Sequence, residues 1–377
     1  MKSGTLCLLF LLATSFGINL SAQNKTPTKP PTKNEEDEVV RVDTELVEVP
    51  VVVTDRTGKP VLNLKQGNFT VYEDGKTQEL TDFSATNAPF EVALLLDTSG
   101  SARSDLQLIQ RAAQSFIDSL RPGDRVSILA FKSTVDSGRA TAVSDLVTPL
   151  TSDRAALRSA LERVTTSNGT PYYDGIVKIV EQVFAGAPQE DFRGRRALVA
   201  LTDGVDSTSL SGFAEAREGL ERSGITSYFI QIDTRPFFEE GVLASCEGEH
   251  TRFSQAQMRR YYRSFGSRSN IEVTTDFCKL GDFERLAISK KLYEIADFEL
   301  NSLAKKSGGK VFPAGDLTDA RNAFRSVAAE IGTKYSLGYY SSNGKRDGSY
   351  RKIRVELRGL PAGSAVRARE GYTAPGN

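Results

Sequence analysis

The middle of the chain alternates apolar strands with amphipathic helices, and this alternation restricts the fold more than any other feature of the sequence. Unbroken apolar runs of strand length occur at 92–96, 126–131, 197–201 and 228–232. Apolar residues recur at helical spacing in 106–120, 157–164, 176–183 and 320–331. Strands without a polar face must be covered on both sides, so the pattern predicts an α/β domain with a doubly wound, mostly parallel sheet. We assign this domain to residues 89–333.

The two ends of the chain have a different rhythm, in which short β-branched runs are separated by Asp and Gly turns. Residues 39–88 contain such runs, and Pro50 inside the first of them suggests a sheet edge. Residues 334–377 contain further strands of the same kind. Neither piece is large enough for a sandwich of its own. We therefore expect one antiparallel β-sandwich made from N- and C-terminal strands, with the α/β domain inserted in it or flanked by it; two separate small modules are the alternative.

The first residues have the order of a cleavable secretory signal, which we assign to residues 1–22. Lys2 precedes an apolar run at 6–13, and small residues follow up to Ala22. Residues 23–38 combine Pro, Thr and charged residues without an apolar anchor and predict a disordered tether. We expect an exported protein that is periplasmic, secreted or at the cell surface and has no stable membrane span after cleavage.

The charge balance argues against a nucleic-acid partner. The chain has 48 basic and 48 acidic side chains, whereas proteins that bind nucleic acids usually carry a basic excess. It also has a single histidine, His250, so acid–base chemistry that relies on histidine has only one candidate.

Oxygen-bearing side chains cluster where the apolar strands end. The segment 97–101, directly after the first strand, is Asp-Thr-Ser-Gly-Ser, and another strand ends in Thr-Asp-Gly at 202–204. The loop 167–171 adds the hydroxyl of Thr170 before a helix. Ligands of such folds bind beyond the carboxyl ends of the strands, and hard cations such as Mg²⁺ prefer oxygen ligands. The alternative is that Asp97 and Ser99 cap the next helix and that Asp203 belongs to a simple turn.

This pattern resembles the metal-ion-dependent adhesion site of the von Willebrand factor type A domain. The resemblance implies a Mg²⁺ ion, with Mn²⁺ or Ca²⁺ as alternatives, bound directly by the hydroxyls of Ser99, Ser101 and Thr170. It also implies that Asp97 and Asp203 hold the ion largely through water, and that an acidic side chain of a protein ligand completes the shell.

The flanking segments resemble a bacterial subgroup of exported proteins that carry this domain. The matching stretches are 47–55, 69–75, 335–340, 351–355 and 368–372. The resemblance implies export from a bacterium and no established activity.

Residues 235–291 interrupt the domain where a short connection would suffice, and this insertion contains Cys246, His250 and Cys278. In an oxidising compartment two cysteines are usually bridged, so we expect a disulfide between Cys246 and Cys278. The alternative is a metal set formed by the two cysteines and the histidine.

The insertion is also rich in aromatic residues, so we expect it to pack a small core of its own. A surface for a protein partner that includes Phe253, Tyr261 and Tyr262 is the alternative role. The mixture of Arg and Tyr at 258–263 is interpreted as a solvated helix face, because the chain has no net charge.

These features together predict a protein that binds other proteins and is not an enzyme. Ser99 lacks the Gly-x-Ser-x-Gly context of a hydrolase, and no Gly-rich phosphate loop occurs. Two alternatives remain: a metal-independent scaffold or assembly factor of the cell envelope, and a metal-assisted hydrolase.

Overall fold

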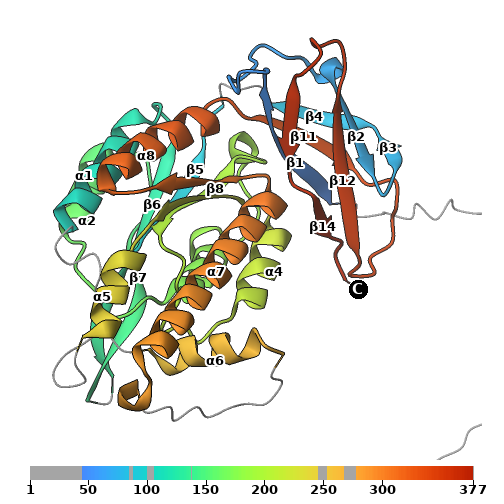
Figure 1. The fold of residues 1–377 in the computed structure, drawn as a ribbon. Coiled ribbons are helices and arrows are strands. Elements are labelled where there is room, and N and C mark those ends of the chain that lie inside the picture. Colours follow the sequence, from blue (N-terminus) through green and yellow to red (C-terminus); the bar gives the residue numbers. More distant parts are fainter. Residues whose placement is uncertain are drawn as a thin grey trace, which may run out of the picture. The chain divides into compact units, whose positions relative to one another are not determined.

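A six-stranded sheet forms the centre of the α/β domain, with the strand order β10-β9-β8-β5-β6-β7 (Figure 1). The computed structural model describes residues 45–84, 88–99, 106–136, 138–244, 253–266 and 277–376. The strands of this sheet are β5 (Glu91–Leu96), β6 (Arg125–Asp136), β7 (Arg139–Thr151), β8 (Arg196–Thr202), β9 (Thr226–Ile232) and β10 (Lys310–Ala314). All neighbours pair in parallel except β6 and β7, which form an antiparallel hairpin. The predicted mostly parallel sheet is confirmed.

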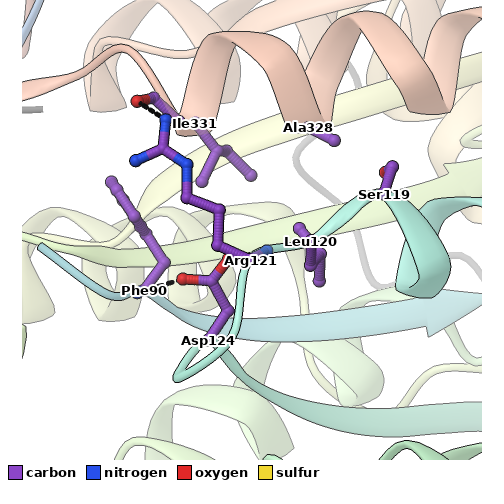
Figure 2. Close-up of a pocket in the computed structure, with 8 residues that line it drawn as sticks. Phe90, Ser119, Leu120, Arg121, Asp124, Ala328 and Ile331 are labelled. Carbon is purple, nitrogen blue, oxygen red and sulfur yellow. Dashed lines mark hydrogen bonds between the residues drawn. The ribbon is translucent and has the colours of Figure 1, made fainter. Parts of the chain in front are cut away.

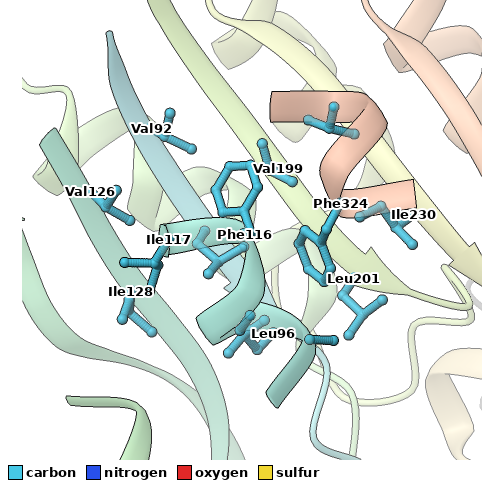
Figure 3. Close-up of a cluster of buried hydrophobic side chains, with 14 of the residues drawn as sticks. Val92, Leu96, Phe116, Ile117, Val126, Ile128, Val199, Leu201, Ile230 and Phe324 are labelled. Atoms are coloured by element: carbon cyan, nitrogen blue, oxygen red, sulfur yellow. The ribbon is translucent and has the colours of Figure 1, made fainter. Parts of the chain in front are cut away.

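Helices cover both faces of this sheet, as the strands without a polar face require. On one face, alternate residues of β5 such as Val92 and Leu96 pack against α1 (Leu106–Ser119), α2 (Arg154–Glu162) and α8 (Leu317–Ile331). Figure 3 shows this cluster, in which the rings of Phe116 and Phe324 have centroids 5.3 Å apart.

The opposite face of β5, with Ala93 and Leu95, is covered by a second set of helices. These are α3 (Tyr172–Lys178), which continues into the π-helical turn Ile179–Val183, α4 (Phe213–Ser223) and the C-terminal half of α7 (Asp282–Ser307).

The remaining strands form two four-stranded antiparallel sheets with the orders β13-β1-β11-β4 and β14-β12-β2-β3. They are β1 (Leu46–Thr54), β2 (Phe69–Glu73), β3 (Lys76–Gln78), β4 (Leu80–Ser84), β11 (Tyr335–Tyr340), β12 (Tyr350–Leu357), β13 (Ala365–Ala368) and β14 (Gly371–Thr373). N-terminal β1 lies between C-terminal β11 and β13, and β12 pairs with β2. Alternate residues of β1 share one apolar core with residues of β2, β11 and β12; they are Val47, Val49, Val51 and Val53. The prediction of one sandwich built from both ends is therefore confirmed, and two separate modules are excluded.

Pro50 does not mark a sheet edge, because β1 is an interior strand of its sheet. The register explains why proline is tolerated there. Pro50 is opposite Ser336 of β11, whereas pairing with β13 begins only at Val51. The side of β1 that faces β13 is thus unpaired at Pro50, so the missing N–H costs no hydrogen bond between strands.

The described part of the insertion contains two short helices and the beginning of a long one. They are α5 (Arg235–Leu243), α6 (Gln255–Arg263) and the first turns of α7, with a 3₁₀ turn at Phe277–Lys279. Helix α7 begins inside the insertion, and the buried face of its first turns includes the polar Arg285 and Ser289. Ile288 and Leu292 of these turns join Val205 and Met258 in an apolar cluster. The expected small core is therefore not the insertion's own, because the insertion shares it with Val205, after β8, and with α7 beyond residue 291.

The signal peptide and the tether predicted for residues 1–38 lie outside the described residues. Within the part of the chain that the structure describes, no helix combines the length and the apolar character needed to cross a bilayer.

Candidate metal site

The strand β5 delivers Asp97 to the carboxyl edge of the sheet, where its side chain is almost completely buried. Asp97 Oδ2 accepts a hydrogen bond of 2.8 Å from the hydroxyl of Thr202, at the end of the neighbouring strand β8. Asp97 Oδ1 accepts one of 3.1 Å from the backbone N–H of Ser99. Burial raises the pKa of Asp97, and hydrogen bonds from Ser99 and Thr202 counteract this shift.

The loop that carries Thr170 is bonded to both neighbouring segments. The N–H of Ser167 donates to the carbonyl of Thr98 at 2.7 Å, which ties the loop to the segment after β5. The N–H of Thr170 donates to the hydroxyl of Ser207 at 2.8 Å, and the N–H of Ser207 donates back to the carbonyl of Thr170 at 3.0 Å. These bonds fix the backbone of Thr170 between the loops that follow β5 and β8.

Asp203 follows β8 directly and has a partner on each carboxylate oxygen. Oδ1 accepts a hydrogen bond of 2.8 Å from the N–H of Val205, and Oδ2 accepts a short one from the hydroxyl of Thr234. The turn requires Gly204, whose φ is +76° and whose Cα faces Leu300 so closely that a Cβ atom would lie 2.8 Å from Leu300 Cδ1. Burial, together with the negative charge of Asp97, raises the pKa of Asp203 to about 7.

The residues present suit a hard divalent cation. Two carboxylates lie close enough for the charge of one to act on the other, and neither forms an ion pair with any described residue. Mutual repulsion of this kind is relieved when a cation binds between the groups. Ser99 and Thr170 carry hydroxyl groups on the adjoining loops, and both residues are buried. Groups of three or more His, Cys, Asp or Glu side chains with metal-binding geometry do not occur among the described residues, so a cation here would depend on hydroxyls.

The structure thus brings together four of the five residues predicted from the sequence. Asp97, Ser99, Thr170 and Asp203 stand on loops that are hydrogen-bonded to one another at the carboxyl edge of β5 and β8. Ser101 lies outside the described residues. The alternative, in which Asp97 and Ser99 cap the next helix and Asp203 belongs to a simple turn, does not account for the hydrogen bonds between the loops.

Asp206 belongs to the same region and was not predicted. Its Oδ2 accepts from the backbone N–H groups of Tyr172 and Tyr173, at 3.0 and 3.4 Å, and from the hydroxyl of Ser209. Asp206 therefore caps the helix that follows Thr170, although it lies on another loop. Burial raises the pKa of Asp206 to about 6. An N-cap normally precedes its helix in the chain, so nothing in the local sequence signals this cap.

Thr234 and Tyr293 were also missed. The hydroxyl of Thr234 lies 2.9 Å from the hydroxyl of Tyr293 and contacts Asp203. Neither residue belongs to the motif at 97–101, to the loop of Thr170 or to Thr-Asp-Gly, and no sequence spacing connects them to Asp203.

The predictions for the insertion are only partly covered by the structure. Cys278 is exposed in the 3₁₀ turn, whereas Cys246 and His250 lie outside the described residues, so the disulfide and the alternative metal set stay predictions. Phe253, Tyr261 and Tyr262 are half-buried and pack against the apolar cluster around Ile288. Their role as a partner surface stays a prediction as well.

A cavity of about 20 Å³ lies at the other end of β5, next to Phe90 (Figure 2). Its wall includes Asp124, which accepts hydrogen bonds from the N–H groups of Phe90 and Arg121 at 2.8 and 2.7 Å. A space of this size holds about one water molecule. It is therefore a packing feature and not part of the candidate metal site.

Comparison with known proteins identifies the fold. Residues 92–205 match the family model of the von Willebrand factor type A domain, and this segment contains Asp97, Thr170 and Asp203. The chain contains a von Willebrand factor type A domain. No curated protein matched the sequence.

Several solved structures are similar to this A domain and its flanks. A von Willebrand factor type A protein from Catenulispora acidiphila has 13% identity and a TM-score of 0.41, and the match covers 88% of this chain and 75% of that one. The pilus adhesin SpaC from Lactobacillus rhamnosus GG has 10% identity and a TM-score of 0.39, with 84% and 49% covered. Proximal thread matrix protein 1 from the mussel byssus, solved with a zinc-occupied MIDAS motif, has 12% identity and a TM-score of 0.39, with 66% and 48% covered. The chain thus spans about half the length of the mussel protein and of the pilus adhesin.

Proposed function

We propose that the A domain binds a protein ligand through a divalent cation at Asp97, Ser99, Ser101, Thr170 and Asp203. The observation that carries this proposal is the hydrogen bonding of three loops to one another around the carboxylates of Asp97 and Asp203, neither of which has an ion-pair partner among the described residues. We propose Mg²⁺ as the ion, with Mn²⁺ or Ca²⁺ as alternatives, because the donor set consists of oxygen atoms and these ions prefer oxygen ligands. When bound, the cation supplies positive charge that attracts an acidic side chain of the ligand.

The hydroxyl and carboxylate residues of the proposed site have different roles in binding the cation. The hydroxyls of Ser99, Ser101 and Thr170 are neutral donors and leave the charge of the cation largely uncompensated. Asp97 and Asp203, whose oxygens already accept hydrogen bonds from Thr202, Ser99, Val205 and Thr234, hold their positions at the rim of the site. This arrangement favours a ligand that brings a carboxylate of its own.

An exposed leucine near the site favours a protein ligand. Leu210 is 99% exposed and lies on the loop that also carries Asp203 and Ser207. Its N–H donates to Asp174 Oδ2 at 3.1 Å, and the N–H of Ser211 donates to Asp174 Oδ1 at 2.8 Å, so the loop is held in place. An apolar side chain presented on a fixed loop beside a charged site can add contact area to a protein interface.

The proposal includes export. The signal peptide assigned to residues 1–22 supports a protein that works in the periplasm, at the cell surface or outside the cell, where a Cys246–Cys278 disulfide would be stable. The subgroup of bacterial exported proteins that the flanks resemble is consistent with this location.

Calorimetric titration of the purified protein with MgCl₂ and MnCl₂ tests the metal. We expect the wild-type protein to bind one equivalent, Asp97→Ala to bind none, and Asp118→Ala, on the exposed surface of α1, to bind like the wild type. Absence of binding heat in the wild-type protein, or unchanged binding by Asp97→Ala, would contradict the proposal.

Capture of cell-envelope proteins on the immobilised protein, with and without EDTA, tests the role of the metal in ligand binding. We expect capture to disappear with EDTA and with Asp97→Ala. Capture that is the same in both conditions would favour the metal-independent scaffold.

A further inference from the structure

Asp203 is connected to helix α7 through a chain of two hydroxyl groups. Thr234, which precedes α5, contacts Asp203 Oδ2 through its Oγ1 atom, and the same atom lies 2.9 Å from the hydroxyl of Tyr293 on α7. The three residues come from three separate elements, so tertiary packing alone brings them together.

The direction of the hydrogen bonds in this chain follows from the number of protons. The ionised carboxylate of Asp203, the form that binds a cation, only accepts, so the single hydroxyl proton of Thr234 then points to Asp203. Thr234 Oγ1 must then accept from Tyr293, whose hydroxyl becomes the donor. The side chain of Asp203 is thus held on Oδ2 by this chain and on Oδ1 by the N–H of Val205.

The insertion holds the ring of Tyr293 in place. The rings of Phe238 and Tyr293 meet edge to face with centroids 6.0 Å apart. Phe253 in turn packs between Phe238, at 5.9 Å, and Phe277, at 5.6 Å. We call Phe238, Phe253, Phe277 and Tyr293 the aromatic cluster; three of its four rings belong to the interruption between β9 and α7.

We propose that Thr234 and Tyr293 are positioning residues of the metal site, and that the insertion acts on the site through them. The aromatic cluster fixes the Tyr293 hydroxyl, the Tyr293 hydroxyl orients Thr234, and Thr234 orients the carboxylate of Asp203. This inference rests on the proposed function, because it assigns the insertion a role in the affinity of that site. It explains why a domain that needs only a short connection after β9 carries this segment.

Mn²⁺ titration of two pairs of full-length variants tests the inference. Tyr293→Phe removes one hydroxyl and keeps the ring, and Tyr262→Phe does the same to a half-buried tyrosine that packs against the same apolar region. Thr234→Val removes the hydroxyl and keeps the shape, and Thr234→Ser keeps the hydroxyl. Removing groups that orient a metal ligand typically weakens metal binding about 10- to 100-fold.

We expect Thr234→Val to weaken Mn²⁺ binding about tenfold and Tyr293→Phe several-fold, since Tyr293 acts one step further from Asp203. Thr234→Ser and Tyr262→Phe should stay within about twofold of the wild type. The double variant Tyr293→Phe/Thr234→Val should bind no more weakly than Thr234→Val alone, because the two hydroxyls act as one unit. Melting temperatures without metal serve as the second readout. We expect Tyr293→Phe and Tyr262→Phe to have similar melting temperatures, although only Tyr293→Phe loses Mn²⁺ affinity.

Wild-type affinity in Thr234→Val and Tyr293→Phe would overturn the inference and leave the proposed function intact. Equal losses in Tyr262→Phe and Tyr293→Phe would overturn it too, because they would indicate general loosening of the insertion. A wild-type protein that binds no Mn²⁺ would overturn the proposed function itself, and with it this inference.

Discussion

The hydroxyl of Thr202 donates a hydrogen bond of 2.8 Å to Asp97 Oδ2 and accepts one of 2.9 Å from the N–H of Gly204. Thr202 thereby joins the ends of β5 and β8 and places the two aspartates of the site next to each other. Since Thr202 is almost completely buried, water cannot replace these bonds if the hydroxyl is lost.

Thr202→Val should lower the free energy of unfolding by about 1–3 kcal/mol, because it leaves a buried carboxylate oxygen and a buried N–H without their partner. Urea unfolding measures this change. Thr202→Ser keeps the hydroxyl and serves as the control. Equal stability of the valine variant and the wild type would contradict the role given to Thr202.

Glu73 is a buried carboxylate that binds several polar groups inside the sandwich, and its removal should strongly lower the stability of the protein. It accepts hydrogen bonds from the hydroxyls of Tyr339 and Tyr372, at 2.8 and 2.9 Å, and from Arg351 at 3.3 Å. Glu73→Ala should cost about 3–5 kcal/mol in chemical denaturation, because it removes the buried carboxylate partner of the Arg351 guanidinium and leaves only the exposed Asp347 at 4.0 Å. Glu356→Ala, which removes an exposed ion pair with Arg354, should cost less than about 1 kcal/mol. Similar losses in both variants would contradict this account.

Lys334 should make stability rise with pH below the ordinary pKa of lysine. Its ammonium group is fully buried, donates to Thr226 Oγ1 at 2.6 Å and lies over the ring of Tyr228, and burial lowers its pKa well below the usual value. The unfolded state therefore binds more protons than the folded state between the lowered pKa and about 10.4, so stability rises with pH across that interval. We expect Lys334→Met to flatten this rise in urea unfolding measured at a series of pH values. An unchanged slope would show that Lys334 keeps an ordinary pKa.

Gly204→Ala should damage both the fold and the site. The left-handed backbone costs a non-glycine residue about 1–2 kcal/mol, and the new methyl group would collide with Leu300. We expect a lower melting temperature and weaker Mn²⁺ binding, because the turn sets the position of Asp203. Gly67→Ala, where a methyl group meets open space, is the matched control. A Gly204→Ala protein as stable as the control would contradict the strain at this turn.

The residues of the site that directly follow a strand could be predicted from the sequence. Asp97 and Asp203 each follow an apolar strand directly, and parallel neighbours place such residues at the same edge of the sheet. Thr234 and Tyr293 could not be found in this way, since they lie 31 and 59 residues away from their partners along the chain and meet them only through the packing of the insertion.

The same distinction holds for the fold. The apolar run 92–96 of β5 was recognised because a strand that is buried on both faces carries apolar residues without alternation. Strand β7 was not, because as the edge strand it carries mixed polar and apolar residues and its position depends on pairing with β6. The prediction of a sheet edge at Pro50 was wrong for a related reason. Local composition does not reveal that β13 pairs with β1 only from Val51 onward.

X-ray diffraction from crystals grown with MnCl₂, recorded at the manganese absorption edge, tests the central claim most directly. The account predicts one anomalous peak between Asp97, Ser99, Thr170 and Asp203, at coordination distance from the hydroxyl oxygens, about 2.1 Å for an ion of this class. Crystals of Asp97→Ala should lack the peak. A wild-type map without a peak at these residues, or with manganese only elsewhere on the protein, would contradict the claim that this edge of the sheet is a metal site.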